Sequence, residues 1–318
     1  MRGALALALC AAACSRPPRA ESERPASAAV SAPAPRPQAP PPTTTVPSAP
    51  PPSRAPRDPM ESAVPAFDAE TIAHVRTLYG AAARNGRHLD VFAKIGDSIT
   101  ESGSFAHDIG HGWMELGAYT RLEPVIRHFT RRAFSSDAED NSFTRASAAA
   151  TAGWTTEDLL QGGEACPVER ELRALRPAFA LVMIGTNDVE RVPLADYERN
   201  LREILRRVEA RGTIAIVSTI PEHRGSPEFT ARSREVNAVI ARVARELHLP
   251  LLDYHAALAG LPNAGLSEDN IHPSAFVDGS DTRAGVFTPA GLRHGYNVRN
   301  LTWLLMLERL IQTVGARG

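Results

Sequence analysis

Residues 91–98 read VFAKIGDS, a mostly apolar run that ends directly on Gly96, Asp97 and Ser98. A short apolar run bounded by a glycine and a polar turn is typical of a buried strand in a parallel sheet. In open α/β sheets, ligands bind where the strands reach their carboxyl ends. The position of Ser98 at the end of this strand therefore makes its hydroxyl a candidate functional group.

The same alternation of strands and helices continues along the chain. Other short apolar runs predict strands at 179–184, 213–218 and 251–253. Amphipathic stretches predict helices at 68–83, 197–210, 229–247 and 298–314. Strands that alternate with helices predict an α/β domain built on a central parallel sheet.

Three further motifs are expected near the same edge of that sheet. They are TAGW at 151–154, GTND at 185–188 and DNIH at 269–272. Because the carboxyl ends of parallel strands lie at one edge, we expect these motifs to meet Ser98 there. Asp269 and His272 stand three residues apart, so a single tight turn can present both side chains on the same side.

The residue types in these motifs are those that acyl transfer requires. A serine hydroxyl is a poor nucleophile near neutral pH and needs a neighbouring imidazole, which His272 supplies and Asp269 orients. Gly153 lets a backbone N–H approach a developing oxyanion without a Cβ in the way, and Asn187 adds a side-chain donor. The set predicts ester hydrolysis through Ser98, with no metal and no organic cofactor.

The order GDSIT, Gly, GTND and Asp-x-x-His resembles the SGNH or GDSL hydrolase family, over residues 89 to 318. The resemblance implies a flavodoxin-like three-layer α/β/α sandwich with a central parallel sheet. It also implies a nucleophile (Ser98), a general base with its orienting carboxylate (His272 with Asp269), and an oxyanion hole (the N–H of Ser98, the N–H of Gly153 and the side chain of Asn187). The chain reads isoleucine after the serine, where the family's name implies leucine.

The motifs and the resemblance together predict a serine esterase that works through an acyl-enzyme. Family analogy favours a short acyl group, such as acetyl on a carbohydrate or a cell-envelope polymer. A lipase or a thioesterase of the same family is the alternative within this class. The rival from another class is a catalytically inactive surface binding lipoprotein with the same fold. Intact Ser98, Asp269 and His272 argue against that rival, because a decayed member is expected to lose one of them first.

The N-terminal part of the chain predicts export. Residues 1–14 have a basic start, an apolar stretch and small residues before Cys14, as in a signal peptide. The AAAC at 11–14 resembles a lipobox, with alanine where leucine is usual, so Cys14 is the expected lipidation site; a plain secretory signal is the alternative. Residues 15–66 hold 16 of the 26 prolines, which predicts a disordered linker. The catalytic domain is then expected at 67–318, outside the cytoplasm and anchored to a membrane by the lipid, or otherwise secreted.

Composition narrows the choice of partners. A formal net charge of -1 gives no electrostatic case for nucleic acid, and the 43% hydrophobic and 22% charged residues are typical of a soluble globular protein. We therefore expect a small-molecule or polymer ester as the substrate, and contact with a membrane only through a lipid anchor. Of the three cysteines, Cys166 alone lies in the expected catalytic domain, which leaves no disulfide framework.

Other side chains near the motifs have expected roles outside the reaction. Asp97 and Asp188 are expected to bond loop amides. Residues 104–141 are expected to form a lid or pocket wall, with Trp113, Phe129 and Phe134 as lining candidates. Arg293, Tyr296 and Arg299 are expected to cap and solvate the last helix; contact with substrate is the alternative. His107 and His111 have the i, i+4 spacing of a zinc motif, but Gly110 weakens the helix which that spacing needs, so a zinc hydrolase is only a rival reading.

Overall fold

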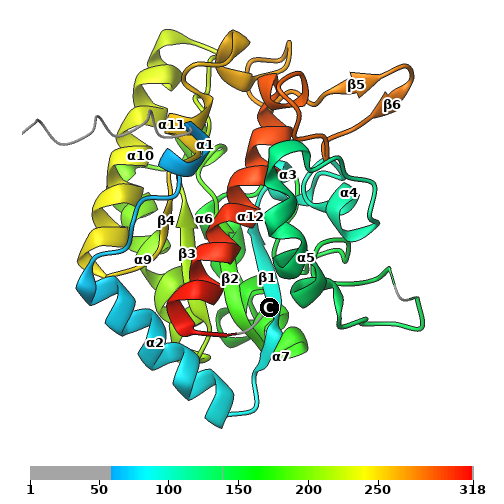
Figure 1. The fold of residues 1–318 in the computed structure, drawn as a ribbon. Helices are drawn as coiled ribbons and strands as arrows, with labels where there is room; N and C mark the ends of the chain where they lie inside the picture. Colours follow the sequence, from blue (N-terminus) through cyan, green and yellow to red (C-terminus); the bar gives the residue numbers. More distant parts are fainter. Residues whose placement is uncertain (1–58, 138, 317–318) are drawn as a thin grey trace, which may run out of the picture. The chain divides into compact units, whose positions relative to one another are not determined.

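The computed structural model describes residues 59–137 and 139–316 (Figure 1). The expected signal peptide at 1–14, with Cys14, lies outside these residues, as does the expected linker as far as residue 58. Within the described part of the chain, no helix is both long and apolar enough to cross a membrane.

The ordered domain includes residues that the sequence assigned to the linker. Helix α1 (Pro59–Ser62) lies before the expected boundary at residue 67, and it contacts helices α11 (Tyr254–Leu258) and α12 (Gly295–Val314). Met60 and Val64 are buried, and Arg309 of α12 donates to the carbonyl of Val64 at 2.6 Å. Proline content predicted a linker over 59–66. The segment is ordered instead because a few of its apolar side chains are buried against α11 and α12.

Besides α1, α11 and α12, the described residues form six strands, nine α-helices and four short 3₁₀ helices. The strands are β1 (His88–Gly96), β2 (Pro177–Met183), β3 (Ile214–Ser218), β4 (Leu251–Leu252), β5 (Val277–Asp278) and β6 (Asp281–Thr282). The α-helices are α2 (Ala69–Arg84), α3 (Ser98–Glu101), α4 (His107–Gly110), α5 (Glu123–Thr130), α6 (Thr156–Leu160), α7 (Pro167–Leu175), α8 (Asp188–Arg191), α9 (Leu194–Ala210) and α10 (Pro227–Glu246). Short 3₁₀ helices are η1 (Gly117–Leu122), η2 (Gly163–Ala165), η3 (Pro262–Gly265) and η4 (Gly291–Arg293).

The central sheet has the strand order β1-β2-β3-β4, and every neighbouring pair is parallel. On the free side of β1, Gly96 forms a parallel bridge with Ala150 and its N–H donates to Ala149 at 2.9 Å. If the segment that ends at Ala150 is counted second, the order is 2-1-3-4-5, which is the flavodoxin-like arrangement. That segment makes a single bridge in place of a regular strand, and it leads into the loop that carries Gly153.

Helices cover both faces of this sheet (Figure 1). Helices α2, α5 and α12 pack on one face, while α7, α9 and α10 pack on the other. All residues of β2 and β3 are buried, as expected for parallel strands with helices on both sides. The predicted three-layer α/β/α sandwich is therefore confirmed.

Helix α12 is buried on nearly all of its surface from Gly295 to Leu307, with polar side chains among the apolar ones. Asn297, Arg299 and Asn300 are at most 1% exposed. A buried polar side chain is costly unless it is hydrogen-bonded, so each of these three is expected to hold a backbone segment. The segments that they hold include the first turn of α3 and the loops that contain Ala106 and Phe276.

Candidate active site

Ser98 lies at the first position of α3, directly after β1 ends. Asp97 caps that helix, because its carboxylate accepts from the N–H of Ile99 at 3.0 Å. At position 96 only glycine fits, since a Cβ would overlap the Thr100 side chain and the carbonyl oxygen of Met183. The strand end, the missing Cβ and the cap together place the Ser98 hydroxyl, which is partly exposed, above the carboxyl edge of the sheet.

The structure brings Ser98, His272 and Asp269 into one hydrogen-bonded line. The Oγ of Ser98 lies 2.9 Å from Nε2 of His272, and Nδ1 of His272 lies 2.6 Å from Oδ2 of Asp269. An ionised carboxylate only accepts, so the ring proton belongs on Nδ1 and is donated to Asp269. Nε2 is then free to accept the proton of the Ser98 hydroxyl. The predicted juxtaposition of the three side chains is present.

Asp269 is fixed by its own loop. Its Oδ1 accepts from the backbone N–H groups of Ile271 and His272, both at 2.9 Å, and from the hydroxyl of Ser267 at 2.8 Å. Asn270, between the pair, has φ +61°, a left-handed conformation that asparagine tolerates. Burial alone would raise the pKa of Asp269, but the hydrogen bonds from Ile271, His272 and Ser267 outweigh it and lower that pKa. Oδ2 is left for the imidazole, so the carboxylate stays charged and oriented.

Gly153 and Asn187 lie in two loops that are joined by a hydrogen bond, and Glu101 of α3 bonds the first of these loops. Gly153 has φ +80°, and its carbonyl accepts from Arg191 at 3.0 Å. The side-chain Nδ2 of Asn187 donates to the carbonyl of Trp154 at 2.9 Å, which uses one of its two protons and leaves the other. Among the described residues, the N–H groups of Ser98 and Gly153 have no hydrogen-bond acceptor. These donors are therefore available to a ligand.

Two carboxylates hold the Gly153 loop in place. Glu101, at the end of α3, accepts from the N–H of Ala152 at 2.7 Å. Asp188, which is 1% exposed, accepts from the N–H of Thr156 at 3.0 Å and from its hydroxyl. Burial raises the pKa of Asp188 to about 6, against the hydrogen bonds from Thr156. The expectation that Asp188 bonds a backbone amide beside the site is confirmed, whereas Asp97 bonds an amide in the first turn of α3 and not one in a loop.

Arg299 has a role that the sequence did not indicate. It was expected to solvate the last helix, yet it is 1% exposed and its guanidinium donates to the carbonyl of Ile99 and, at 2.9 Å, to the hydroxyl of Thr100. The guanidinium also lies 3.7 Å from the ring centre of Phe105. Burial lowers the pKa of Arg299, although the charge of Asp97 opposes that shift. Arg299 thus fixes the helix that carries Ser98.

Lys94 is the only lysine of the chain and lies on β1, four residues before the nucleophile. Its side chain is 3% exposed and donates to the carbonyl of Phe143 at 2.7 Å. Burial lowers the pKa of Lys94 to about 7, with a further contribution from the charge of Arg145. This amine supports the loop that follows residue 141, and it does not contact Ser98.

The two histidines of the rival zinc motif lie close together, because the N–H of His111 donates to the carbonyl of His107 at 3.0 Å and their ring centroids are 6.3 Å apart. The ring of His111 has other partners, however. It stacks on Trp113, and its Nδ1 lies 2.6 Å from a carboxylate oxygen of Glu139. Burial, with the charges of Lys94 and His111, lowers the pKa of His107 to about 4. Within residues 59–137 and 139–316, no group of three or more His, Cys, Asp or Glu side chains is placed to hold a metal ion.

The segment 104–141 forms a wall made of α4, η1 and α5, but only one of its aromatic candidates lines a cavity. Phe129 is buried in the core against Phe92, and Phe134 packs on the core with Arg145 over its ring, so these two expectations were wrong. Both rings are drawn inward because the core below offers apolar partners. Trp113 is 59% exposed and lines a cavity of about 550 Å³.

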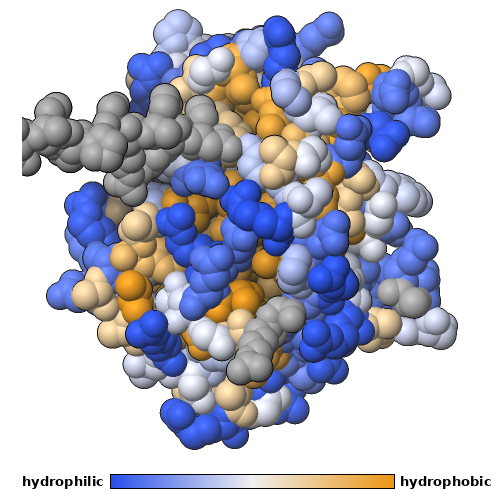
Figure 2. Space-filling model, in the orientation of Figure 1, coloured by the Kyte–Doolittle hydropathy of each residue, from blue (hydrophilic) through white to orange (hydrophobic). Residues whose placement is uncertain are grey.

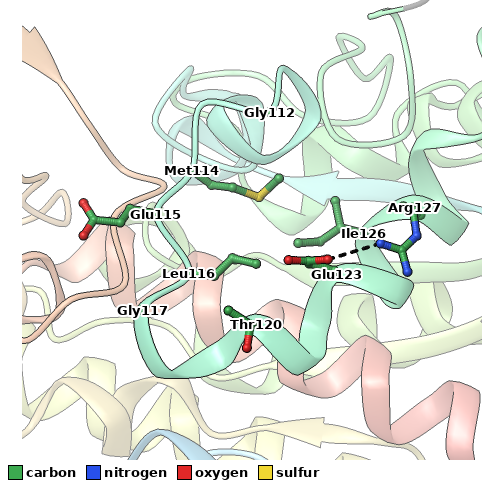
Figure 3. Close-up of a pocket in the computed structure, with 9 residues that line it drawn as sticks. All are labelled: Gly112, Met114, Glu115, Leu116, Gly117, Thr120, Glu123, Ile126 and Arg127. Carbon is green, nitrogen blue, oxygen red and sulfur yellow. Dashed lines mark hydrogen bonds and ion pairs between the residues drawn. The ribbon is translucent and has the colours of Figure 1, made fainter.

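A second cavity of about 550 Å³ is lined by residues of the same segment, between Gly112 and Arg127 (Figure 3). The side chains of Met114, Leu116 and Ile126 converge in it, while Glu115 points away. Its floor carries the ion pair of Glu123 with Arg127, at 3.3 Å. None of the residues that line this cavity is one of the predicted site residues.

The chain was compared with models of known protein families and with curated proteins. Residues 95–276, more than half of the chain, match the family model described as GDSL-like lipase/acylhydrolase. None of the curated proteins is similar enough in sequence to count as a relative.

Similar solved structures include an α/β hydrolase enzyme from the metagenome of Lake Arreo, Spain, with 20% identity, a TM-score of 0.46, and 69% of this chain and 95% of that chain covered. A catalytic mutant of an acetylxylan esterase from Geobacillus stearothermophilus has 20% identity and a TM-score of 0.45, over 68% of this chain and 93% of that one. The lipase/acylhydrolase from Enterococcus faecalis has 18% identity and a TM-score of 0.43, over 70% of this chain and 95% of that one.

Proposed function

The chain belongs to the GDSL-like lipase/acylhydrolase family and is a hydrolase of ester bonds; from this premise we propose that it is a serine esterase that works through an acyl-enzyme on Ser98. One observation carries the proposal. The Oγ of Ser98 lies 2.9 Å from Nε2 of His272, whose other nitrogen lies 2.6 Å from Asp269. Both distances are those of a nucleophile, its base and the group that orients the base.

In the first half of the reaction, Oγ of Ser98 attacks the ester carbonyl carbon while its proton moves to Nε2 of His272. Asp269 stabilises the imidazolium and is not itself protonated. Its lowered pKa, caused chiefly by the hydrogen bonds that outweigh its burial, keeps it negative for this role. The tetrahedral intermediate collapses, the bond to the leaving alcohol breaks, and the alcohol takes the proton from His272. The acyl group remains on Ser98.

The negative charge on the intermediate's oxygen needs preorganised donors. The N–H of Ser98, the N–H of Gly153 and the remaining Nδ2 proton of Asn187 are the available ones. Glu101 and Asp188 hold the loop of Gly153, so its N–H needs little reorganisation when charge develops. Donors arranged before the reaction stabilise the transition state most strongly.

In the second half, water enters where the alcohol left. His272 takes a proton from this water, the resulting hydroxide attacks the acyl carbon, and the acid departs as Oγ of Ser98 recovers the proton. No step draws on a metal or an organic cofactor.

We assign short acyl esters, such as acetyl groups on a carbohydrate or a cell-envelope polymer, as the substrates. The support is the openness of the site: the side chains of His272 and Asp269 are 40% and 48% exposed, so a bulky polymer can approach the nucleophile. A long acyl chain would instead need a covered apolar channel. A series of p-nitrophenyl esters from acetyl to palmitoyl, together with an acyl thioester, separates the acetylesterase from a lipase or a thioesterase by which kcat/KM is highest.

The direct test is hydrolysis of p-nitrophenyl acetate by the purified full-length protein. Ser98→Ala should lower kcat by several orders of magnitude, whereas the control Ser136→Ala, at an exposed serine, should leave it unchanged. EDTA should have no effect on the wild type. Activity of Ser98→Ala close to that of the wild type, or activity that EDTA abolishes, would instead favour the hydrolase based on His107 and His111. Equal background for all variants with every ester would favour the non-catalytic binding protein.

We also propose that the protein is exported and anchored through lipid on Cys14. The support is the basic start, the apolar stretch and the AAAC at 11–14. Radiolabelled palmitate should enter the wild type and Cys10→Ser but not Cys14→Ser, and only the last should leave the membrane fraction. Equal labelling of all three, or of none, would contradict lipidation at Cys14 and leave a plain secretory signal.

A further inference from the structure

The cavity that Trp113 lines lies on two segments, one after the nucleophile helix α3 and one after the motif that ends at His272. The residues that line this cavity of about 550 Å³ are Asp108, Trp113, Ser280, Asp281, Thr282 and Arg283. Its first wall comes from the chain after α3, and its second is the hairpin β5–β6, which begins five residues after His272. Figure 1 shows this hairpin next to α3 and α4, at the upper right. Five residues of extended chain span at most about 18 Å, so the hairpin is within reach of the site.

The rim of this cavity is unusual for its exposed apolar surface. In the described part of the chain, the large hydrophobic side chains classed as exposed are Trp113 (59%) and Val277 (56%). Trp113 lines the cavity, and Val277 pairs across the hairpin with Thr282, which also lines it. Solvent-facing tryptophan is rarely needed for the fold, so a pair of exposed apolar groups at one rim indicates a binding surface.

The indole is held in a defined position. The ring of His111 stacks on it with a centroid distance of 4.4 Å and an interplanar angle of 21°. His111 is in turn fixed by Glu139 at 2.6 Å. A flat aromatic ring that is backed by another ring and still exposed is a rigid apolar plate, which can be covered at little cost in side-chain entropy.

Around this plate the lining is polar and carries both signs of charge. Ser280 and Thr282 bring hydroxyls, Asp281 a carboxylate and Arg283 a guanidinium. The Nε of Arg283 is buried and has no hydrogen-bond partner among the described residues. Figure 2 shows hydrophilic and hydrophobic residues mixed at the position of this hairpin. Such a lining suits a neutral ligand that has many hydroxyls and one apolar face.

Both walls are pinned to the helix that also fixes the nucleophile. The side chain of Asn300, in α12, accepts from the N–H of Ala106 at 2.9 Å and donates to the carbonyl of Ala284 at 3.1 Å. Asn297 accepts from Phe276 at 3.0 Å and donates to the carbonyl of Arg283 at 2.8 Å. Both asparagines are fully buried.

Arg299, between them in sequence, holds the first turn of α3. The cavity and Ser98 are therefore built on one rigid support, which fixes their mutual distance.

We infer that this cavity is a carbohydrate subsite, in which a pyranose ring of a polymeric substrate stacks on Trp113 while the hairpin bonds its hydroxyls, so that acetyl groups elsewhere on the same chain reach Ser98. The C–H face of a pyranose packs on an aromatic plate by dispersion, and its rim of hydroxyls can both donate and accept. This inference rests on the proposed esterase activity and specifies its substrate class.

The test compares a small ester with two acetylated sugar chains. The full-length protein is assayed with p-nitrophenyl acetate, with acetylated xylohexaose and with O-acetylated chitohexaose; the two sugars separate a plant-type from an envelope-type glycan. Trp113→Ala should raise KM for at least one hexasaccharide about tenfold, and leave kcat/KM for p-nitrophenyl acetate within about twofold. Trp113→Phe, which keeps a ring, should restore most of the affinity.

Two further variants guard the interpretation. Arg127→Ala, in the cavity lined by Met114 and Ile126, should leave KM for both kinds of substrate unchanged. Asp281→Asn should raise KM for the sugar chains and not for the small ester. Equal effects of Trp113→Ala on small and polymeric esters, or no hydrolysis of either hexasaccharide, would overturn the subsite. Failure of the esterase itself is distinct, because it would show as no turnover of p-nitrophenyl acetate that depends on Ser98.

Discussion

Arg299 donates to the backbone carbonyl of Ile99, so a buried charge from the last helix holds the residue next to the nucleophile. The two residues are 200 positions apart in the chain. The same guanidinium also reaches Thr100 and lies over the ring of Phe105, so it replaces water around the start of α3. The nucleophile's position therefore depends on packing between the two ends of the domain.

Arg299→Met should destabilise the domain by about 3–5 kcal/mol, because it leaves the Ile99 carbonyl and the Thr100 hydroxyl without their donor and Asp97 without its nearby charge. Urea unfolding measures this loss. Arg127→Met, at an arginine whose side chain is 67% exposed, serves as the control and should stay within about 0.5 kcal/mol of the wild type. A free energy of unfolding near that of the wild type for Arg299→Met would contradict the role assigned to the guanidinium.

Asn187→Ala should lower kcat for p-nitrophenyl acetate by about 10²- to 10³-fold with little change in KM, since the lost donor acts on charge that develops only in the transition state. Steady-state kinetics on the folded variant gives both constants. A rise in KM at unchanged kcat would show that Asn187 binds the ground state and is not part of the oxyanion hole.

Glycine substitutions should separate close packing from backbone conformation. Gly96→Ala should abolish activity and lower the melting temperature strongly, because its Cβ overlaps Thr100 and Met183. Gly153→Ala meets open space but has to adopt φ +80°, which costs about 1–3 kcal/mol and should displace the oxyanion donor. Gly103→Ala, with open space and no positive φ, should behave as the wild type. A normal melting temperature for Gly96→Ala would refute the packing argument.

Asp188 should make stability depend on pH between about 4 and 6. Its folded pKa of about 6 lies above the ordinary value of 3.8, so the folded state holds the proton more tightly than the unfolded state. The contribution is fully present below pH 3.8 and is lost as the pH rises through 6, by at most about 1.4 kcal/mol per pH unit. Asp188→Asn should remove this slope. Parallel curves of the free energy of unfolding against pH for wild type and variant would contradict the raised pKa.

The local patterns in the sequence were sufficient for the main strands and helices. Asp68 was expected to cap the helix that begins after it, and its carboxylate accepts from the N–H of Thr71 at 2.7 Å. Helix α9 begins at Leu194, three residues before the expected start at Tyr197. Leu194 stands three residues before Tyr197, so it extends the same apolar stripe, and it packs against the core. Boundaries of this kind depend on packing that a single pattern does not encode.

The motifs at 96–98 and 269–272 predicted that Ser98, His272 and Asp269 lie together, since a strand end and a three-residue spacing are local properties. The buried donors of α12 were missed for the opposite reason. Arg299 and Asn297 look like ordinary surface residues in sequence, and their burial depends on loops far away in the chain. A polar residue inside an otherwise apolar helical stretch was the available signal. Likewise, nothing in the order of residues 107–113 indicates that His111 stacks on Trp113.

The burial of Lys94 has a consequence for handling the protein. It is the chain's only lysine, it is 3% exposed, and its amine donates to the carbonyl of Phe143. Reagents that acylate amines therefore find no lysine on the folded surface. They can react with the Lys94 amine only when the domain opens. The rate at which Lys94 itself is acylated would therefore report opening of the domain.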